Sequence, residues 1–201
     1  MKHILITQRI DKIEKINEER ESIDIRLNEL IVSLGMIPIQ LSSKILVKSS
    51  INCFLDSLSP DGIILSGGND IGQYKERDNL EINILTWSQI NKIPVIGICR
   101  GLQILNAFCN GSLVKVEGHC KTRHMIYGIK EFNNIEVNSY HNFGVTKETL
   151  GENLISLAKS NDGCIEALKH KSNPWMGIMW HPEREECFKR NDLDMINCHL
   201  N

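Results

Sequence analysis

The residues with the clearest chemical potential are a cysteine, a histidine and a glutamate that stand far apart in the sequence. Cys99 lies in the segment Gly-Ile-Cys-Arg-Gly, residues 97–101, where a β-branched apolar run gives way to a helical pattern. Small residues two before and two after a nucleophile let a strand turn sharply into a helix and expose the side chain between them. The unpaired N–H groups of the helix start would favour a thiolate. A buried structural cysteine is an equally good interpretation of this segment alone.

A thiolate nucleophile needs a base, and the base needs a group that orients it. His181 follows the apolar run at residues 175–180 and precedes Pro182, with Glu183 next. Proline restricts the residue before it to an extended backbone, which favours a ring held at the strand end with Glu183 accepting its second N–H. Alone, this segment is more simply a turn with a solvated carboxylate. Together with Cys99 it predicts a Cys-His-Glu triad.

Acyl transfer at such a triad requires N–H donors for the oxyanion that forms on the substrate. Gly67 and Gly68 follow an apolar strand pattern at residues 62–65, and one of them can present a backbone N–H. The second donor would be Arg100, the residue after the nucleophile. An ordinary Gly-Gly turn is the alternative, whereas a phosphate-binding P-loop is disfavoured because no Gly-Lys-Ser/Thr follows.

The elements that must position these residues alternate between short β-branched runs and longer segments of helical period. Strands are expected at residues 3–7, 37–41, 62–65 and 94–98, and helices at 17–34, 79–91 and 101–109. Shorter strand-like runs at 112–116, 135–137, 164–168 and 175–179 indicate a few extra, antiparallel strands. The pattern predicts an α/β three-layer sandwich with a central, mainly parallel, flavodoxin-like sheet, which binds ligands at the carboxyl ends of its strands.

The composition is that of an ordinary globular protein. The chain has 201 residues, of which 41% are hydrophobic and 24% charged, and a formal net charge of -2. This balance gives no electrostatic reason to expect a nucleic-acid or membrane partner. No repeat or Gly/Pro-rich linker interrupts the sequence, so one domain over residues 1–201 is expected. Without a long apolar run or a signal-peptide pattern, a cytoplasmic location is expected, and a homodimer is left open.

Three segments in this order resemble the class I glutamine amidotransferase-like superfamily: SGGND at 66–70, GICRGLQ at 97–103 and HPE at 181–183. The resemblance covers nearly the whole chain and implies cleavage of γ-glutamyl amide bonds. It makes Cys99 the nucleophile, His181 the base and Glu183 the group that orients the base. It assigns the oxyanion hole to the N–H groups of Gly68 and Arg100. No synthetase domain accompanies these segments, so ammonia channelling is not expected.

Further segments look like the branch of stand-alone γ-glutamyl hydrolases, namely SGGNDIGQY, VNSYHNFGV, and IEAL before GIMWHPERE. By this resemblance the glutamyl group is held by residues of three segments: Gly67, Asn69, Gln103, Ser139, Tyr140 and His141. The opening ITQRID and the segment at 17–39 resemble small hydrolases of bacterial capsule phosphoramidate synthesis. Those enzymes remove glutamate from γ-glutamyl-CDP-amidate and leave cytidine diphosphoramidate.

A pyrophosphate leaving group needs cations or backbone donors nearby. Arg9, directly after the first strand, is the favoured candidate. Lys121, Arg123 and His124 form a basic cluster that is more simply a solvated loop.

No metal or other cofactor is expected. The seven cysteines are an odd number without a CxxC pair, so they indicate neither a disulfide framework nor a four-ligand zinc site. His119, Cys120 and His124 lack a fourth ligand, and γ-glutamyl transfer through a cysteine needs no metal.

The expected function is therefore hydrolysis of a small γ-glutamyl substrate through a thioester, with γ-glutamyl-CDP-amidate as the first candidate. A glutaminase subunit of a two-protein amidotransferase, a γ-glutamyl-aminobutyrate hydrolase and an inactive binding or regulatory protein on the same fold stay open. Arg77, Asp78 and Glu81 are interpreted as charges at a helix start. Glu166 is equally compatible with supporting the site and with facing solvent.

Overall fold

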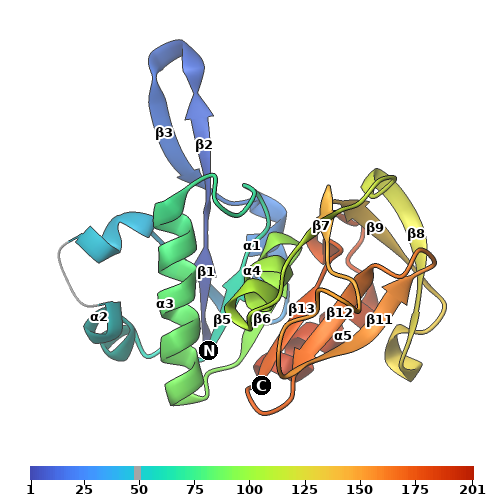
Figure 1. Cartoon of the computed structure of the whole chain (residues 1–201). Helices are drawn as coiled ribbons and strands as arrows, with labels where there is room; N and C mark the ends of the chain where they lie inside the picture. The colour runs from blue at the N-terminus through green and yellow to red at the C-terminus, as the bar shows by residue number, and fades with distance from the viewer. Residues whose placement is uncertain (48–50) are drawn as a thin grey trace.

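The computed structural model describes residues 1–47 and 51–201. Within them, the central element is a nine-stranded sheet with the strand order β4-β1-β5-β6-β13-β12-β11-β8-β9 (Figure 1). Five neighbouring strands are parallel: β4 (Ile37–Leu41), β1 (His3–Thr7), β5 (Gly62–Leu65), β6 (Val95–Ile98) and β13 (Trp175–Ile178). The sheet continues with antiparallel strands: β12 (Ile165–His170), β11 (Leu154–Ser160), β8 (Cys120–Gly128) and β9 (Ile135–Tyr140).

The helices cover the parallel half of the sheet on both faces. They are α1 (Ile25–Ser33), α2 (Ile51–Leu58), α3 (Lys75–Asn91), α4 (Arg100–Phe108) and α5 (Arg190–Leu200). In Figure 1, α3 and α4 lie in front of the sheet and α1 and α5 behind it. Short 3-10 helices lie at Glu14–Ile16, Ser43–Val47, Lys130–Phe132 and Pro182–Arg184. Because both faces are covered, β5, β6 and β13 are buried along their whole length and consist of continuous apolar runs.

Two glycines allow α4 to approach the sheet closely. Gly97 of β6 and Gly177 of β13 are paired in register. A Cβ atom on Gly97 would lie 2.4 Å from the backbone of Gly101, and one on Gly177 would lie 2.9 Å from the Leu102 side chain. The start of α4 is therefore fixed against the carboxyl end of β6, where Cys99 lies.

The structure confirms the expected α/β fold with a parallel core and added antiparallel strands, and it corrects the expected elements at three places. The expected helix at residues 17–34 is wrong in its first part, because residues 18–22 form β3 (Glu18–Ser22), the partner of β2 (Arg9–Ile13) in a hairpin that projects from the body (Figure 1). Asn17 makes the turn with a positive φ of 49°. The helix begins only after Asp24, whose side chain accepts from the Arg26 N–H.

The second correction concerns the strand at residues 175–179, which was expected to be antiparallel. It is β13, and it runs parallel to β6 while pairing antiparallel with β12. It is thus the strand at which the sheet changes direction. The third concerns residues 112–116, which give only the short β7 (Val114–Lys115), paired with β10 (Phe143–Gly144) outside the central sheet. Among the described residues, no helix has the length and apolar composition to cross a membrane.

Candidate active site

Cys99 occupies a strained turn between β6 and α4. Its backbone has φ 52° and ψ -104°, which places this non-glycine residue at positive φ. Its N–H donates to the Ile178 carbonyl at 2.7 Å, and its carbonyl accepts from the Gln103 N–H at 3.2 Å. A Cβ atom on Gly101 would lie 2.0 Å from the Leu65 carbonyl oxygen, so the turn tolerates no side chain there. The thiol is thereby fixed at the N-terminus of α4.

His181 and Glu183 form a buried pair directly after β13. Nδ1 of His181 lies 2.6 Å from Oε1 of Glu183, and the two side chains are 2% and 5% exposed. A carboxylate can only accept, so Nδ1 carries the hydrogen and Nε2 is left to exchange a proton elsewhere. The backbone of His181 is extended before Pro182, as the sequence predicts. This is the arrangement that a general base needs.

Gly67 leaves the space in which the His181 ring sits beside Cys99. A Cβ atom on Gly67 would lie 2.8 Å from Cε1 of His181 and 3.7 Å from Cβ of Cys99. Burial on its own would lower the pKa of His181, but the charges of Glu183 and Cys99 and their hydrogen bonds raise it to about 9. The imidazole therefore holds a proton beside the sulfur at neutral pH.

The loop that follows β5 is held in place by Arg77. The Arg77 Nη2 donates to the carbonyls of Ser66 and Gly67 at 2.7 and 2.9 Å. Gly68 has φ 116°, and a Cβ atom there would lie 2.6 Å from Cβ of Arg9. Arg100 is the first residue of α4, so its N–H is among those that a helix leaves unpaired. The two N–H groups expected to form an oxyanion hole thus belong to backbone on a fixed loop and at a helix start.

A buried network of charges lies beneath this loop and the Cys99 turn. Glu81 accepts from Arg77 Nε at 3.1 Å, from Thr7 Oγ1 at 2.8 Å and from Arg100, which also pairs with Asp78. Arg77, Glu81 and Arg100 are at most 1% exposed. Burial lowers the pKa of Arg77 to about 10, although the charge of Glu81 opposes this, so the guanidinium stays charged at neutral pH. The interpretation of these residues as helix-start charges is therefore wrong for Arg77 and Glu81, which tie α3 to the site.

Four of the residues expected to hold a glutamyl group have polar atoms bonded within the protein. Gln103 donates to the Phe143 carbonyl at 2.8 Å, and Ser139 donates to the His119 carbonyl at 2.6 Å. Asn69 and His141 are the other two. The Asn69 amide bonds both the N–H and the carbonyl of Ile10 at 2.8 Å, and the buried His141 ring lies 3.0 Å from the Phe143 carbonyl oxygen.

Other expected residues border the triad itself. The ring of Tyr140 stands edge to face with that of His181 at 5.8 Å, and it is 40% exposed. A small pocket of about 30 Å³ is lined by Arg9, Gly67, Gly68, His181 and Glu183, among others. Arg9 is half-exposed there and pairs with Asp11.

The basic cluster near residue 121 is divided between two places. Lys121 is exposed, and Arg123 pairs with Glu136 and Glu185. His124 turns inward and faces Glu166 at 3.4 Å. The structure thus gives the first expected cation, Arg9, a place at the pocket beside His181, and it gives His124 a different environment.

Two residues near the triad were missed from the sequence. Asn138 accepts from the His181 N–H at 2.9 Å and donates to its carbonyl at 2.8 Å. The Arg184 guanidinium lies over the Tyr140 ring at 4.6 Å from its centre and lines the small pocket. A signal for Asn138 existed, because it is a polar residue in a strand beside the expected Ser139.

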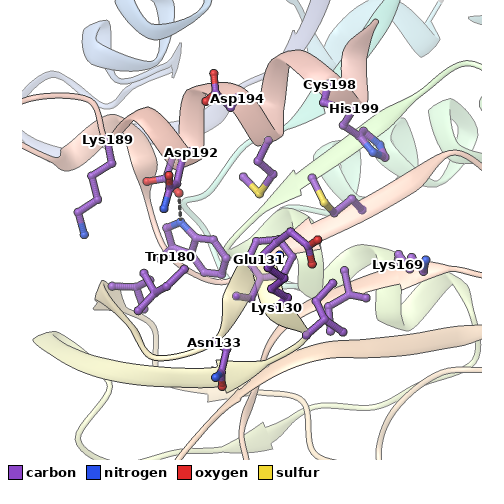
Figure 2. A pocket seen from close by; sticks show the side chains of 18 residues that line it. Lys130, Glu131, Asn133, Lys169, Trp180, Lys189, Asp192, Asp194, Cys198 and His199 are labelled. Atoms are coloured by element: carbon purple, nitrogen blue, oxygen red, sulfur yellow. Dashed lines mark hydrogen bonds between the residues drawn. The ribbon is translucent and has the colours of Figure 1, made fainter.

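A second pocket, of about 800 Å³, lies away from this site. It is lined by residues of α5, β9 and β13 and by the loop before β9 (Figure 2). Trp180, the residue before His181, donates there to Asp192 at 3.1 Å, and Lys130, Lys169 and Lys189 stand around it (Figure 2). None of the expected site residues is among the described residues that line it.

The fold and this site define a class of protein. The chain belongs to the family "Glutamine amidotransferase class-I", whose sequence profile matches residues 17–193. The gamma-glutamyl-CDP-amidate hydrolase of Campylobacter jejuni is 40% identical over 129 residues, covering 61% of this chain and 62% of that protein. One subunit of the glutamine-hydrolyzing GMP synthase of Methanocaldococcus jannaschii is 32% identical over 127 residues, covering 61% and 64%. The match thus spans less than two thirds of the length of either relative.

A solved structure shares the whole fold. The glutaminase domain of Trypanosoma brucei CTPS, solved with bound acivicin, matches over 94% of its own chain and 100% of this one, with a TM-score of 0.72 and 11% sequence identity. At this identity the likeness establishes the fold alone.

Proposed function

We propose that the chain hydrolyses a γ-glutamyl amide bond through a γ-glutamyl thioester on Cys99. The observation that carries the proposal is the placement of Cys99 at positive φ at the start of α4, with the His181 ring beside it and Glu183 behind that ring. Membership of the glutamine amidotransferase family supports the same chemistry.

In the first step the Cys99 sulfur attacks the γ-carbonyl carbon of the substrate. The carbonyl oxygen becomes an oxyanion, which the N–H groups of Gly68 and Arg100 stabilise. As the carbon–nitrogen bond breaks, His181 gives its Nε2 proton to the leaving nitrogen. The product of this step is a γ-glutamyl thioester and a free amine or amidate.

In the second step water hydrolyses the thioester. Nε2 of His181 takes a proton from the water as its oxygen attacks the carbonyl carbon, and the carbon–sulfur bond then breaks. Glutamate leaves, and the proton returns to the pair formed by Cys99 and His181. Glu183 stays ionised throughout and keeps the hydrogen of His181 on Nδ1.

The substrate we propose is γ-glutamyl-CDP-amidate, which would give glutamate and cytidine diphosphoramidate. Two observations support it. A relative with 40% identity is the gamma-glutamyl-CDP-amidate hydrolase of C. jejuni. Arg9 and Arg184 line the small pocket beside His181, and guanidinium groups bind pyrophosphate oxygens well. With such a nucleotide-linked substrate, we expect the protein to act in the cytoplasm.

The test is glutamate release from glutamine, γ-glutamyl-aminobutyrate and γ-glutamyl-CDP-amidate by the purified protein. We expect the amidate to have the highest kcat/KM, at least about a hundredfold above the other two, which is about 2.7 kcal/mol. Equal and poor turnover of all three would contradict the substrate. Turnover of glutamine only in the presence of a synthetase would support a glutaminase subunit instead.

The nucleophile is tested by Cys99→Ala, with Cys109→Ala as the matched control. Both cysteines are buried and flank α4, and burial raises the pKa of the Cys109 thiol to about 11. Cys99→Ala should abolish turnover, whereas Cys109→Ala should keep it. Mass spectrometry of acid-quenched protein should find the γ-glutamyl group on Cys99. Full hydrolysis by Cys99→Ala would refute the mechanism.

A further inference from the structure

Three histidines and a glutamate converge in the antiparallel half of the sheet, outside the residues proposed for catalysis. We name them the histidine cluster: His119, His124, His141 and Glu166. The first directly precedes β8, the second lies in β8, the third directly follows β9 and the glutamate lies in β12. Glu166 is fully buried, which excludes the interpretation that it faces solvent.

Within residues 1–47 and 51–201, the carboxylate of Glu166 has no hydrogen-bond partner. Both of its oxygens are buried and unpaired there, and so is Nε2 of His124. A buried carboxylate whose oxygens meet no donor is costly to keep in the interior of a protein. A cation bound at the centre of the cluster would pair with this carboxylate.

Two of the rings use one nitrogen, here called the outer nitrogen, to bond a group outside the cluster. The other nitrogen of each ring, the inner one, points to the centre. His119 Nε2 lies 2.8 Å from Asp162 Oδ2, and His141 Nδ1 lies 3.0 Å from the Phe143 carbonyl oxygen. A carboxylate and a carbonyl accept hydrogen bonds, so both of these ring nitrogens carry hydrogens.

It follows that the inner nitrogens of the neutral rings carry lone pairs. His119 Nδ1 and His141 Nε2 are only 3.3 Å apart. Two lone pairs cannot hydrogen-bond to each other, whereas a cation between them would be bound by both. A ring whose outer N–H is held by a carboxylate or a carbonyl is the usual form of a metal-binding histidine.

Three inner nitrogens surround one carboxylate oxygen at separations close to those between the ligand atoms of a tetrahedral zinc site. Oε1 of Glu166 lies 3.5 Å from His119 Nδ1, 3.4 Å from His124 Nε2 and 3.7 Å from His141 Nε2. Zinc binds imidazole nitrogen at about 2.0–2.1 Å, which puts neighbouring ligand atoms of a tetrahedron about 3.3–3.4 Å apart. We propose that the histidine cluster is a closed, structural binding site for Zn²⁺.

The position of the cluster gives the metal a mechanical role. The Phe143 carbonyl accepts from His141 and also from Gln103, which stands one turn after Cys99 on α4. The Met179 N–H, directly after β13, donates to the Glu166 carbonyl. A bound Zn²⁺ would thus fasten β8, β9 and β12 to the wall of the site without taking part in the reaction.

The sequence could not indicate this site, because it suggested the wrong partners. Next to His119 it offers Cys120, which is exposed. The structure instead brings in His141 and Glu166 from other strands. The buried Cys164 offers a further ligand atom, since His119, Cys164 and Glu166 have ligand atoms within 4.8 Å of one another. A thiol beside imidazoles favours zinc over magnesium or calcium.

The test measures metal directly, in a Cys99→Ala background that removes the thiol proposed as nucleophile. Elemental analysis of protein purified without chelator from zinc-supplemented culture should find about one Zn²⁺ per chain. After removal of zinc, Co²⁺ should give the strong visible absorption of a tetrahedral site. Failure of γ-glutamyl hydrolysis would leave both readouts unchanged.

The matched variants are His124→Gln and His3→Gln. The His124 side chain is the most exposed of the cluster, at 18%, so its replacement is the one best tolerated by the fold. His124→Gln should weaken Co²⁺ binding at least about a hundredfold, which is about 2.7 kcal/mol. His3→Gln, at the start of β1, should bind Co²⁺ like the parent. Protein without zinc that also gives no Co²⁺ absorption would refute the proposal, as would equal Co²⁺ affinity in the two variants.

Discussion

The two halves of the central sheet each contain a group of buried ionisable side chains, and the two groups balance their charges differently. In the parallel half, Glu81 is bonded to Arg77, Arg100 and Thr7. In the antiparallel half, Glu166 faces three imidazoles and has no hydrogen-bond partner among the described residues. The carboxylate of the first group is paired within the protein, whereas we propose that the carboxylate of the second group is paired by a bound cation.

This difference matches what each group does for the site. Arg77 holds the carbonyls of Ser66 and Gly67, so the paired network fixes the loop beside Cys99 by means of the chain's own charges. The histidine cluster reaches the site through the Phe143 carbonyl and through the Met179 N–H, which donates to the Glu166 carbonyl. We therefore expect substitutions in the paired network to act on the fold itself, and substitutions in the cluster to act through what it binds.

The largest effect is expected from Glu81→Gln. This change leaves two buried guanidinium groups with Asp78 as their remaining carboxylate, and breaking a buried ion pair in this way costs about 3–5 kcal/mol. The free energy of unfolding in urea measures it. Glu76→Gln, on the exposed face of the same helix, removes only a surface pair with Lys44 and should be nearly neutral. Equal losses in the two variants would mean that the network adds nothing to stability.

The next effect is a pH dependence of stability that depends on His181. Its folded pKa of about 9 lies above the unfolded value of about 6.5. The stabilisation is therefore fully present below about pH 6.5 and is lost as pH rises through about 9, with a size of about 3 kcal/mol. Urea unfolding at about pH 6.5 and about pH 9.5 measures it. His181→Gln should remove this part of the pH dependence, and an unchanged profile would contradict the assignment.

A smaller effect is expected where the two halves meet. Asn138 of β9 bonds both the N–H and the carbonyl of His181, so Asn138→Ala should cost about 2 kcal/mol of stability. It should also lower kcat about tenfold with little change in KM, because the base loses its support but the substrate contacts stay. Asn83→Ala, on the exposed side of α3, is the control. A change in KM alone would place Asn138 in substrate binding instead.

The sequence indicates the elbow and the triad segments because their signals are local. Strands that are covered on both faces are continuous apolar runs, and the glycines around Cys99 permit its turn. The segment from Glu18 to Ser22 could not be predicted in the same way, because its Glu and Arg residues favour a helix. It is a strand only because it pairs with residues 9–13, where Asp11 also accepts from the Ser22 hydroxyl at 2.5 Å.

Long-range side-chain chemistry escapes prediction for a related reason. His119 and Glu166 stand 47 positions apart and meet only because β8 and β12 both pair with β11 in one sheet. The polar residues of β8 also hide its strand pattern, since His124 turns inward to other polar groups. A sequence pattern that scores apolar alternation cannot recognise a polar residue as buried. The catalytic roles of Cys99, His181 and Glu183 stay predictions that the variants above test.

The smallest effect is expected from Glu166→Gln in zinc-free protein, and it is the sharpest test of the contrast with Glu81. The substitution removes a buried carboxylate that no donor satisfies among the described residues, so its cost should be below about 1 kcal/mol, against about 3–5 kcal/mol for Glu81→Gln. With Zn²⁺ at a hundredfold excess over its dissociation constant, the parent should gain about 2.7 kcal/mol that the variant lacks. The measurement is urea unfolding of both proteins with and without Zn²⁺. If Glu166→Gln costs as much as Glu81→Gln in zinc-free protein and Zn²⁺ does not change the stability, protons on the neighbouring imidazoles balance the charge of Glu166. Both halves of the sheet would then pair their buried carboxylates within the protein.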